Sequence, residues 1–250
     1  MAKTVKTNRT EKLPVAERFV SINGEGPFAG KPAAFIRFVG CNLTCSYCDT
    51  RWACDLKCPC EWLDAWALAQ WVAETGAHHV TLTGGEPLLH PILGELLRRL
   101  VNGKGPHDLP YELPKDLVVE IETNGSVSLN RIEALLNFLP KSQSERIVFT
   151  VDYKLPGSGM ESKMDRGVFA SLGMRDAVKF VVSDRKDLDR MRSVAAQLDL
   201  WNRTQVFVSP VFGAIEPAEI AQYLIDNKLF GARLQLQLHK VIWPGVEKGV

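Results

Sequence analysis

The sequence predicts an α/β protein built on a parallel β-sheet. Short runs of β-branched and aromatic residues alternate with longer stretches in which apolar residues recur at helical spacing. This alternation is typical of βα units, whose consecutive strands run parallel. At least six units fit into the 250 residues. A closed TIM barrel needs eight, so the count favours either an open doubly wound sheet or a partial barrel.

The expected elements follow one another in regular order. Seven segments have the composition of strands: 33–40, 78–85, 116–125, 146–154, 176–184, 204–210 and 232–240. Five stretches between them have the periodicity of amphipathic helices: 62–75, 91–102, 129–139, 185–199 and 216–228. Segment 103–116 is rich in Pro and Gly, which indicates a surface loop inside one βα unit.

Composition limits the class of protein. Apolar residues make up 46% of the chain, enough for one core, so we expect a single domain over 15–250 after a flexible N-terminal segment 1–14. The net charge of +1 provides no broad field to attract nucleic acid or an anionic membrane. No apolar run reaches the ~18 residues of a membrane span, and no signal peptide is evident. We expect a cytoplasmic protein without nucleic-acid or membrane partners.

Residues with chemical function fall where the expected strands end. They are Cys41, Cys45, Cys48, the TGGEP segment 83–87, the ETNG segment 122–125, Asp152, Lys154, Ser183, Asp184, Ser209, Pro210 and His239. In parallel α/β folds, ligands bind at the carboxyl ends of the strands. The positions therefore predict one shared site at this edge of the sheet.

All six cysteines lie between positions 41 and 60. A cytosolic chain of this length rarely keeps a disulfide framework, so metal or redox chemistry is the better interpretation. The C-x3-C-x2-C spacing of Cys41, Cys45 and Cys48 lets one loop wrap three thiolates around an inorganic centre, zinc or an iron–sulfur cluster. A structural zinc site needs a fourth protein ligand. A [4Fe–4S] cluster with three thiolates leaves one iron open to a small molecule.

The segment CNLTCSYC at 41–48 resembles the cluster loop of the radical S-adenosylmethionine (SAM) enzymes, and GGEP at 84–87 resembles their glycine-rich segment. The resemblance implies that three cysteines hold a [4Fe–4S] cluster and that SAM binds its fourth iron. Gly84 and Gly85 would let the backbone approach the ligand, and Glu86 would accept a hydrogen bond from the SAM ammonium. The implied fold is a partial (β/α)6-type TIM barrel.

Within this superfamily, residues 21–50 and 239–250 closely resemble the family of 7-carboxy-7-deazaguanine synthases of the queuosine and deazapurine pathway. Asn23 stands where that family often has Gln. The resemblance implies a carbon–nitrogen lyase that converts 6-carboxy-5,6,7,8-tetrahydropterin into 7-carboxy-7-deazaguanine with loss of ammonia. A 5′-deoxyadenosyl radical abstracts a substrate hydrogen, and the rearranged radical takes it back, so that SAM is reused.

The resemblance also implies roles for individual residues, with no catalytic residue beyond the SAM radical. The expected substrate contacts are Ile22, Asn23, Gly24, Glu25, Arg37, Thr83, Glu122, His239 and Val250. The expected SAM contacts are Gly84, Gly85, Glu86, Asp152, Tyr153, Lys154, Ser209, Pro210, Val211 and Phe212. Thr50 would bind Mg²⁺ through its hydroxyl. The expected partners are the pterin substrate, a reductant such as flavodoxin and a second copy of the chain.

Several of these residues have simpler interpretations. Arg37 could be a surface residue of its strand, although its apolar neighbours argue against this. Thr50 could be a helix N-cap, His239 a hydrogen-bonded core histidine, and Gly125 a turn residue whatever Glu122 does. For Cys54, Cys58 and Cys60, the sequence leaves open a second metal centre, the lining of an insertion, or thiols without function.

Two functions of other classes remain at this stage. An activase of a glycyl-radical enzyme would use the same cluster and SAM but would act on a partner protein through an exposed docking surface. A non-enzymatic zinc-binding interaction module would explain the cysteines, yet it would leave GGEP and the positions of the strand ends unexplained.

Overall fold

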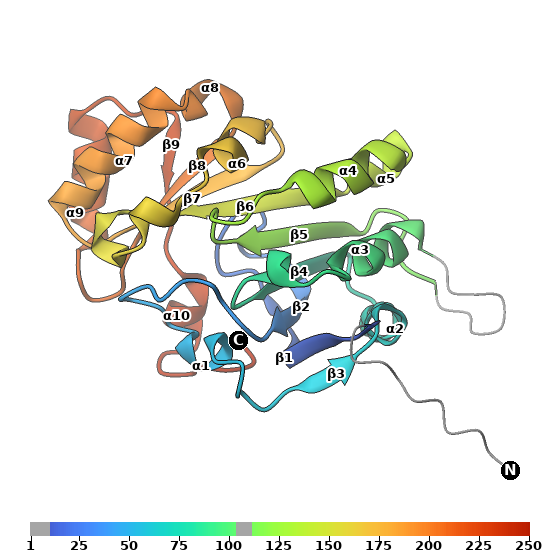
Figure 1. The fold of residues 1–250 in the computed structure, drawn as a ribbon. Coiled ribbons are helices and arrows are strands. Elements are labelled where there is room, and N and C mark those ends of the chain that lie inside the picture. The colour runs from blue at the N-terminus through green and yellow to red at the C-terminus, as the bar shows by residue number, and fades with distance from the viewer. Residues whose placement is uncertain (1–10, 104–111) are drawn as a thin grey trace, which may run out of the picture.

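The structure, a computed structural model, describes residues 11–103 and 112–250. Nine strands form one sheet: β1 (Leu13–Ile22), β2 (Pro32–Phe38), β3 (Glu61–Leu63), β4 (His79–Gly84), β5 (Val118–Thr123), β6 (Ile147–Tyr153), β7 (Ala177–Val182), β8 (Gln205–Pro210) and β9 (Ala232–Leu234). Their order across the sheet is β3-β1-β2-β4-β5-β6-β7-β8-β9 (Figure 1). Parts of the expected N-terminal segment and of the expected loop 103–116 lie outside the described residues.

From β2 to β9, every neighbouring pair of strands is parallel. The strands from β2 onward follow one another in chain order except for β3, so each connection returns the chain to the same end of the sheet. The sheet stays open, with β3 and β9 as its edges. The predicted α/β fold, a partial barrel on a parallel sheet, is confirmed.

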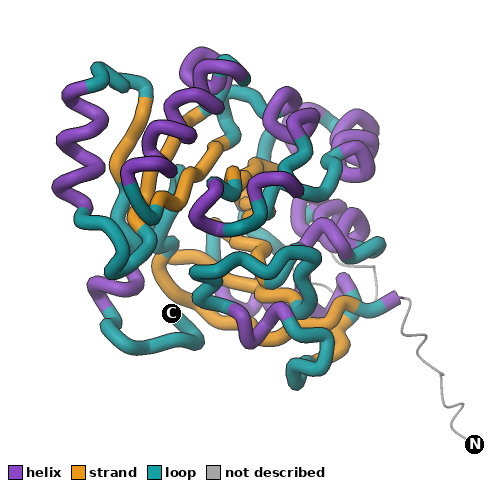
Figure 2. Tube along the Cα trace, turned by 60° about the vertical axis from the view of Figure 1, so that its left-hand side comes forward, coloured by secondary structure: helices purple, strands orange, loops and turns teal. Residues whose placement is uncertain are grey.

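Most helices flank the strands on the outside of the curved sheet (Figure 2), whereas the first and the last lie beside the carboxyl ends of the strands (Figure 1). The helices are α1 (Arg51–Cys54), α2 (Ala65–Thr75), α3 (Leu93–Asn102), α4 (Asn130–Phe138), α5 (Lys141–Ser144), α6 (Arg166–Ser171), α7 (Arg185–Gln197), α8 (Leu200–Arg203), α9 (Pro217–Asp226) and α10 (Leu238–Ile242). Short 3₁₀ turns cover Pro87–Leu89, Pro156–Ser158 and Glu161–Lys163. No described helix has both the length and the apolar character needed to span a bilayer.

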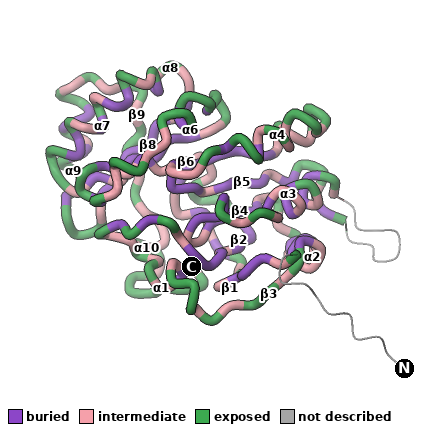
Figure 3. Tube along the Cα trace, viewed as in Figure 1, coloured by how far each residue is buried: buried purple, intermediate pink, exposed green. Residues whose placement is uncertain are grey.

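The core lies between the sheet and the outer helices, and the strands are the most buried part of the chain (Figure 3). Alternate residues of a strand face opposite sides, so Val80 and Leu82 of β4 enter this core while Thr81 and Thr83 face the other side. Glu120 of β5 also faces that side and is buried. The inner face of the sheet is therefore polar, which is unusual for a buried surface and marks it for function.

Three expectations about the elements need correction. Leu13 and Pro14, expected in a flexible segment, begin β1, because β1 pairs antiparallel with both β2 and β3. Neither β1 nor β3 was expected. Of the expected strand 232–240, only 232–234 pairs with β8, and the chain then turns into α10.

Candidate active site

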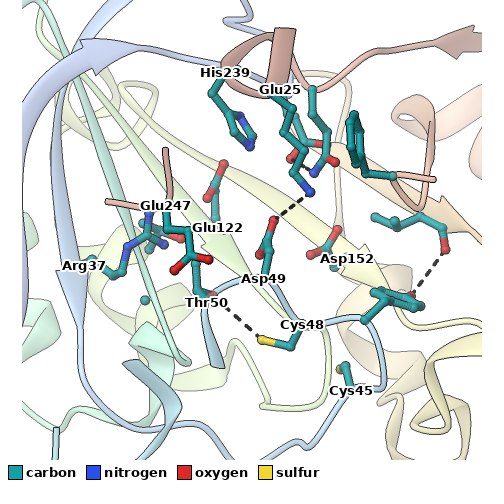
Figure 4. A pocket seen from close by; sticks show the side chains of 18 of the residues that line it. Glu25, Arg37, Cys45, Cys48, Asp49, Thr50, Glu122, Asp152, His239 and Glu247 are labelled. Carbon is teal, nitrogen blue, oxygen red and sulfur yellow. Dashed lines mark hydrogen bonds and ion pairs between the residues drawn. The ribbon is translucent and has the colours of Figure 1, made fainter. Parts of the chain in front are cut away.

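A cavity of about 730 Å³ opens at the carboxyl ends of the strands (Figure 4), a volume typical of small-molecule sites. It gathers most of the predicted site residues: Ile22, Gly24, Glu25, Arg37, Cys41, Cys45, Cys48, Thr50, Thr83, Gly84, Gly85, Glu122, Asp152, Lys154, Val211, Phe212, His239 and Val250. Five others do not line it: Asn23, Glu86, Tyr153, Ser209 and Pro210. The cavity thus joins the cysteine loop to the side chains expected around a substrate.

The loop after β2 carries the three cysteines of the cluster motif. The Cys41 sulfur accepts hydrogen bonds from the Leu43 amide (3.4 Å) and from Asn124 Nδ2 (3.6 Å). A hydrogen bond with Cys54 is the main cause that lowers the pKa of Cys41 and of Cys48 to about 6, whereas burial raises the pKa of Cys45. A lowered pKa favours the thiolate, which is the form that binds iron.

Cys54 lies at this site, although the sequence alone did not place it there. Helix α1 brings its sulfur to 3.9 Å from the Cys48 sulfur, and Cys54 lines the cavity. Cys58 and Cys60 do not line it. Among the residues that the structure describes, no three His, Cys, Asp or Glu side chains are arranged to hold one metal ion.

The two glycines of GGEP allow a close backbone contact with the start of the cysteine loop. The Gly85 amide donates to the Phe38 carbonyl (3.0 Å), and a Cβ at Gly85 would lie 2.1 Å from the Gly40 carbonyl oxygen. A Cβ at Gly84, whose φ is +154°, would lie 2.4 Å from the Phe38 carbonyl oxygen. These glycines therefore fix the cysteine loop against β4, and both also line the cavity.

Glu86 differs from its expected role, because its carboxylate points away from the cavity and is fully buried. One carboxylate oxygen accepts from the Asn124 amide (2.7 Å), and the other accepts from the Leu88 amide (3.0 Å) and the Thr123 hydroxyl (2.8 Å). Burial raises its pKa to about 7. Glu86 thus ties the end of β4 to the end of β5, and its carboxylate does not face the cavity.

The side chain of Arg37 points into the cavity from β2 (Figure 4). Its Nε donates to Glu17 Oε1 over 2.8 Å, and both side chains are largely buried, so Arg37 is not a surface residue. Glu122 follows from β5 and receives a hydrogen bond from Thr83, while burial raises its pKa. The guanidinium of Arg37 and the carboxyl group of Glu122 thus lie in the same wall of the cavity.

The turn after β1 divides its residues between two roles. Ile22, Gly24 and Glu25 line the cavity, but Asn23 is buried beneath it, where its Oδ1 accepts from the Thr81 hydroxyl (2.8 Å). Asn23 thus supports the turn through Oδ1, while its Nδ2 is buried without a hydrogen-bond partner among the described residues. Glu25 Oε1 is buried without a hydrogen-bond partner among the described residues, as expected for an atom that faces a bound ligand.

Four charged side chains form a network on one side of the cavity. Lys179 Nζ lies 3.2 Å from Glu25 Oε2 and 3.5 Å from Asp152 Oδ1, and Lys154 Nζ lies 2.8 Å from Asp152 Oδ2. Burial alone would lower the pKa of Lys179, but the carboxylates of Asp152 and Glu25 raise it well above its usual value. Lys179 is not among the residues predicted from the sequence, although a lone lysine inside the apolar strand β7 is a signal of such a site.

The C-terminal residues fold over the cavity. His239 lies on α10 and not at the end of a strand, as was expected, and it packs against Gly24. Lys240 Nζ lies 3.3 Å from Asp49 Oδ2, and Lys248 Nζ lies 4.2 Å from the centre of a Trp52 ring. These contacts hold the segment against the turn after β1 and against the cysteine loop.

Three of the expected SAM contacts at the ends of β6 and β8 do not line the cavity. The Tyr153 ring packs on Phe169 and Phe180 in the core behind the sheet, because it alternates with Asp152 along β6. Ser209 and Pro210 are buried in β8, where Ser209 Oγ has no hydrogen-bond partner among the described residues, and the lining of the cavity begins at Val211. Thr50 stands at the N-cap position of α1 without a capping hydrogen bond, and its hydroxyl lies 3.8 Å from the Cys48 sulfur.

The fold and the three-cysteine site are those of the radical SAM enzymes, and residues 35–150 match the model of the Radical SAM superfamily. The chain is 44% identical to the 7-carboxy-7-deazaguanine synthase of Clostridium acetobutylicum, over 94% of this chain and 98% of that protein. It is 36% identical to the synthase of Methanospirillum hungatei, over 92% and 85% of the two chains. The protein belongs to the 7-carboxy-7-deazaguanine synthase family, as the sequence predicted.

A comparison with solved structures gives the same fold. The crystal structure of QueE from Escherichia coli superposes with a TM-score of 0.62, at 22% sequence identity, over 90% of this chain and 94% of that chain. The arrangement of strands and helices is therefore shared at low sequence identity.

Proposed function

We propose that the protein converts 6-carboxy-5,6,7,8-tetrahydropterin into 7-carboxy-7-deazaguanine with loss of ammonia. Membership of the synthase family supports this reaction. The observation that carries the proposal is the single cavity, which places the cysteine loop and the buried side chains of Arg37 and Glu25 around one volume. An activase of a protein partner and a zinc module are not favoured, because neither accounts for the family or for this enclosed, charged site.

The residues present fit the cofactors that the family uses. Cys41, Cys45 and Cys48 are free thiols on one loop at the edge of the cavity, the donor set of a three-thiolate [4Fe–4S] cluster. When bound, the cluster and SAM supply the radical that abstracts a hydrogen atom from the substrate. Gly84, Gly85, Asp152, Lys154, Val211 and Phe212 are the residues that we assign to SAM, since all of them line the cavity.

On the substrate side, the guanidinium of Arg37 pairs with the pterin carboxylate, because a planar fork of N–H donors matches a carboxylate. The unpartnered Glu25 Oε1 accepts a hydrogen bond from an N–H group of the pterin ring. Thr83, Glu122, His239 and the backbone of Ile22 and Gly24 complete this wall of the cavity. Val250 lines it as well, and we assign this residue to the substrate.

Further parts of the proposal rest on the family resemblance. Thr50 binds a Mg²⁺ ion through its hydroxyl, with oxygens of substrate and water as further ligands. A flavodoxin supplies the electron, and two copies of the chain form a homodimer. The enzyme works in the cytoplasm, where free thiols such as Cys41, Cys45 and Cys48 stay reduced.

The test is reconstitution of the protein with iron and sulfide without oxygen, followed by reduction and addition of SAM and 6-carboxytetrahydropterin. We expect mass spectrometry to detect 7-carboxy-7-deazaguanine without stoichiometric consumption of SAM, and more of it with Mg²⁺ than without. Formation of 5′-deoxyadenosine while the pterin stays intact would contradict the proposed substrate and leave the radical chemistry standing.

A further inference from the structure

We propose that Glu17 is a positioning residue that orients Arg37 toward a carboxylate substrate and at the same time fastens the C-terminal segment over the cavity. Glu17 belongs to β1, the antiparallel strand that the repeating βα pattern does not require. This inference rests on the proposed function for the nature of the substrate, whereas the link from Glu17 to the C-terminal segment stands on the structure.

A β-bulge in β1 turns Glu17 toward the site. Val15 pairs with Phe38 and Glu17 pairs with Arg37, so the register shifts between Val15 and Glu17. Directly opposed residues of antiparallel strands point to the same face. Val15 and Phe38 lie in the core under the helices, whereas Arg37 lines the cavity. Regular alternation would have put Glu17 on the face of Val15, so the bulge re-aims it, as bulges often do beside active sites.

The two carboxylate oxygens of Glu17 serve two different partners. Oε1 accepts from Arg37 Nε over 2.8 Å, and Oε2 accepts from the Gly249 amide over 3.2 Å. The side chain of Glu17 is 15% exposed and that of Arg37 is 12% exposed, so water competes little for this contact. One largely buried carboxylate therefore joins the substrate-facing arginine to the exposed residue Gly249.

The contact with Glu17 also leaves the two terminal nitrogens of Arg37 free to bind a ligand. Because Glu17 binds Nε, the two terminal nitrogens of Arg37 extend beyond it, and neither donates a hydrogen bond within the part of the chain that the structure describes. Their paired N–H groups match the two oxygens of a planar carboxylate. Glu17 thus fixes the guanidinium plane before the ligand arrives, which lowers the entropy cost of binding.

The principal variant is Glu17→Gln, which keeps the size of the side chain. In the amide, one acceptor oxygen becomes an NH2 donor and the negative charge that strengthens both bonds is lost, so the contacts with Arg37 and with Gly249 both become weaker. We expect KM for the carboxylated pterin to rise about tenfold with kcat changed less than twofold, because a lost hydrogen bond to a charged group has this effect on binding. Hydrogen–deuterium exchange in residues 243–250 should become faster in the reconstituted protein.

Glu61→Gln is the matched control. Glu61 of β3 forms an exposed ion pair of 3.4 Å with Arg18, which is the neighbour of Glu17 on β1. This control should leave KM and the exchange of 243–250 unchanged, and thermal unfolding should show both variants folded.

Unchanged exchange in Glu17→Gln overturns the inference whatever the substrate is. If exchange is faster in Glu17→Gln but the wild-type enzyme does not convert the pterin, the proposed function is contradicted and the link from Glu17 to the C-terminal segment stands. If the wild-type enzyme converts the pterin and Glu17→Gln has the same KM, Glu17 does not position Arg37 and that role is overturned.

Discussion

Lys179 reaches from β7 to within 3.2 Å of Glu25 Oε2, while the same Nζ lies 3.5 Å from Asp152 Oδ1. Glu25 belongs to the substrate side of the proposed site and Asp152 to the SAM side. A single buried lysine therefore neutralises one carboxylate from each side. The pairing places one cation against both carboxylates in the cavity, where an unpaired charge would be costly.

Replacement of Lys179 by Met should destabilise the protein by about 3–5 kcal/mol, because it leaves the carboxylates of Glu25 and Asp152 buried with less compensation. Urea unfolding of the wild type and of the variant measures this difference. The double variant Lys179→Met, Glu25→Gln should recover part of the loss, since it also removes one of the uncompensated charges. Additive losses in the double variant would show that the pair is not coupled.

Each of the variants Cys41→Ala, Cys45→Ala and Cys48→Ala should lose cluster iron after reconstitution, because the loop then offers only two thiolates. Iron analysis and the visible absorption of the protein measure the loss. Cys58→Ala is the matched control, since Cys58 lies outside the cavity and should keep the full iron content. Loss of iron in this control would place a ligand where we infer none.

Gly85→Ala should lower the free energy of unfolding by about 1–3 kcal/mol, because the new Cβ would lie 2.1 Å from the Gly40 carbonyl oxygen, which is backbone and cannot turn aside. Reconstituted iron should fall as well, since Gly40 precedes the first cluster cysteine. Gly94→Ala on α3 serves for comparison: its Cβ would lie 3.6 Å from Leu135 Cδ2, and this helical site should tolerate or favour alanine. Equal effects of the two variants would contradict the proposed contact.

Glu120→Gln should make the protein more stable at pH 8 than the wild type, by about 1–3 kcal/mol. Glu120 lies beneath the cavity with Oε1 hydrogen-bonded to Thr150 (2.5 Å) and Oε2 without a partner among the described residues. Burial raises its pKa to about 8, from a usual value of 4.5. The folded state then binds a proton that the unfolded state releases, so wild-type stability falls as pH rises from about 4.5 to about 8.

Denaturant unfolding between pH 5 and pH 8.5 checks this prediction. The variant should show a smaller decline over this range than the wild type, although Glu86, with its pKa of about 7, contributes a decline of the same sign in both proteins. Parallel pH profiles of the two proteins would mean that Glu120 is not the protonated group.

The sequence predicts the parallel part of the fold because each βα unit signals itself locally, as in the apolar run of β7 followed by the amphipathic helix α7. It does not reveal β1, whose segment places Pro14, Glu17 and Arg18 among apolar residues and lacks a simple alternation. The Leu–Gln alternation of 232–240 predicts a longer strand than β9. The strand ends early, and just past its end the side-chain amide of Gln235 bonds to the backbone of Gly26, which is 209 positions away in sequence.

The candidate site, too, is predicted from the sequence only in part. Motifs identify which loops meet, and the cavity contains the three cysteines, both glycines of GGEP and Arg37. The direction of a side chain depends on contacts that a motif does not contain. Glu86 turns inward because the Asn124 and Leu88 amides and the Thr123 hydroxyl need an acceptor, and no pattern within GGEP indicates this.

Both edges of the sheet, β3 and β9, are only three residues long. A long free edge offers a row of unpaired amides and carbonyls to which the strand of another molecule can add. β3 and β9 themselves expose few such groups, but β3 pairs only with Leu13–Val15, so the rest of β1 pairs with β2 alone among the described strands. The longest open edge of the described sheet is therefore the stretch Glu17–Ile22 of β1, and it is there that an incoming strand finds room to add.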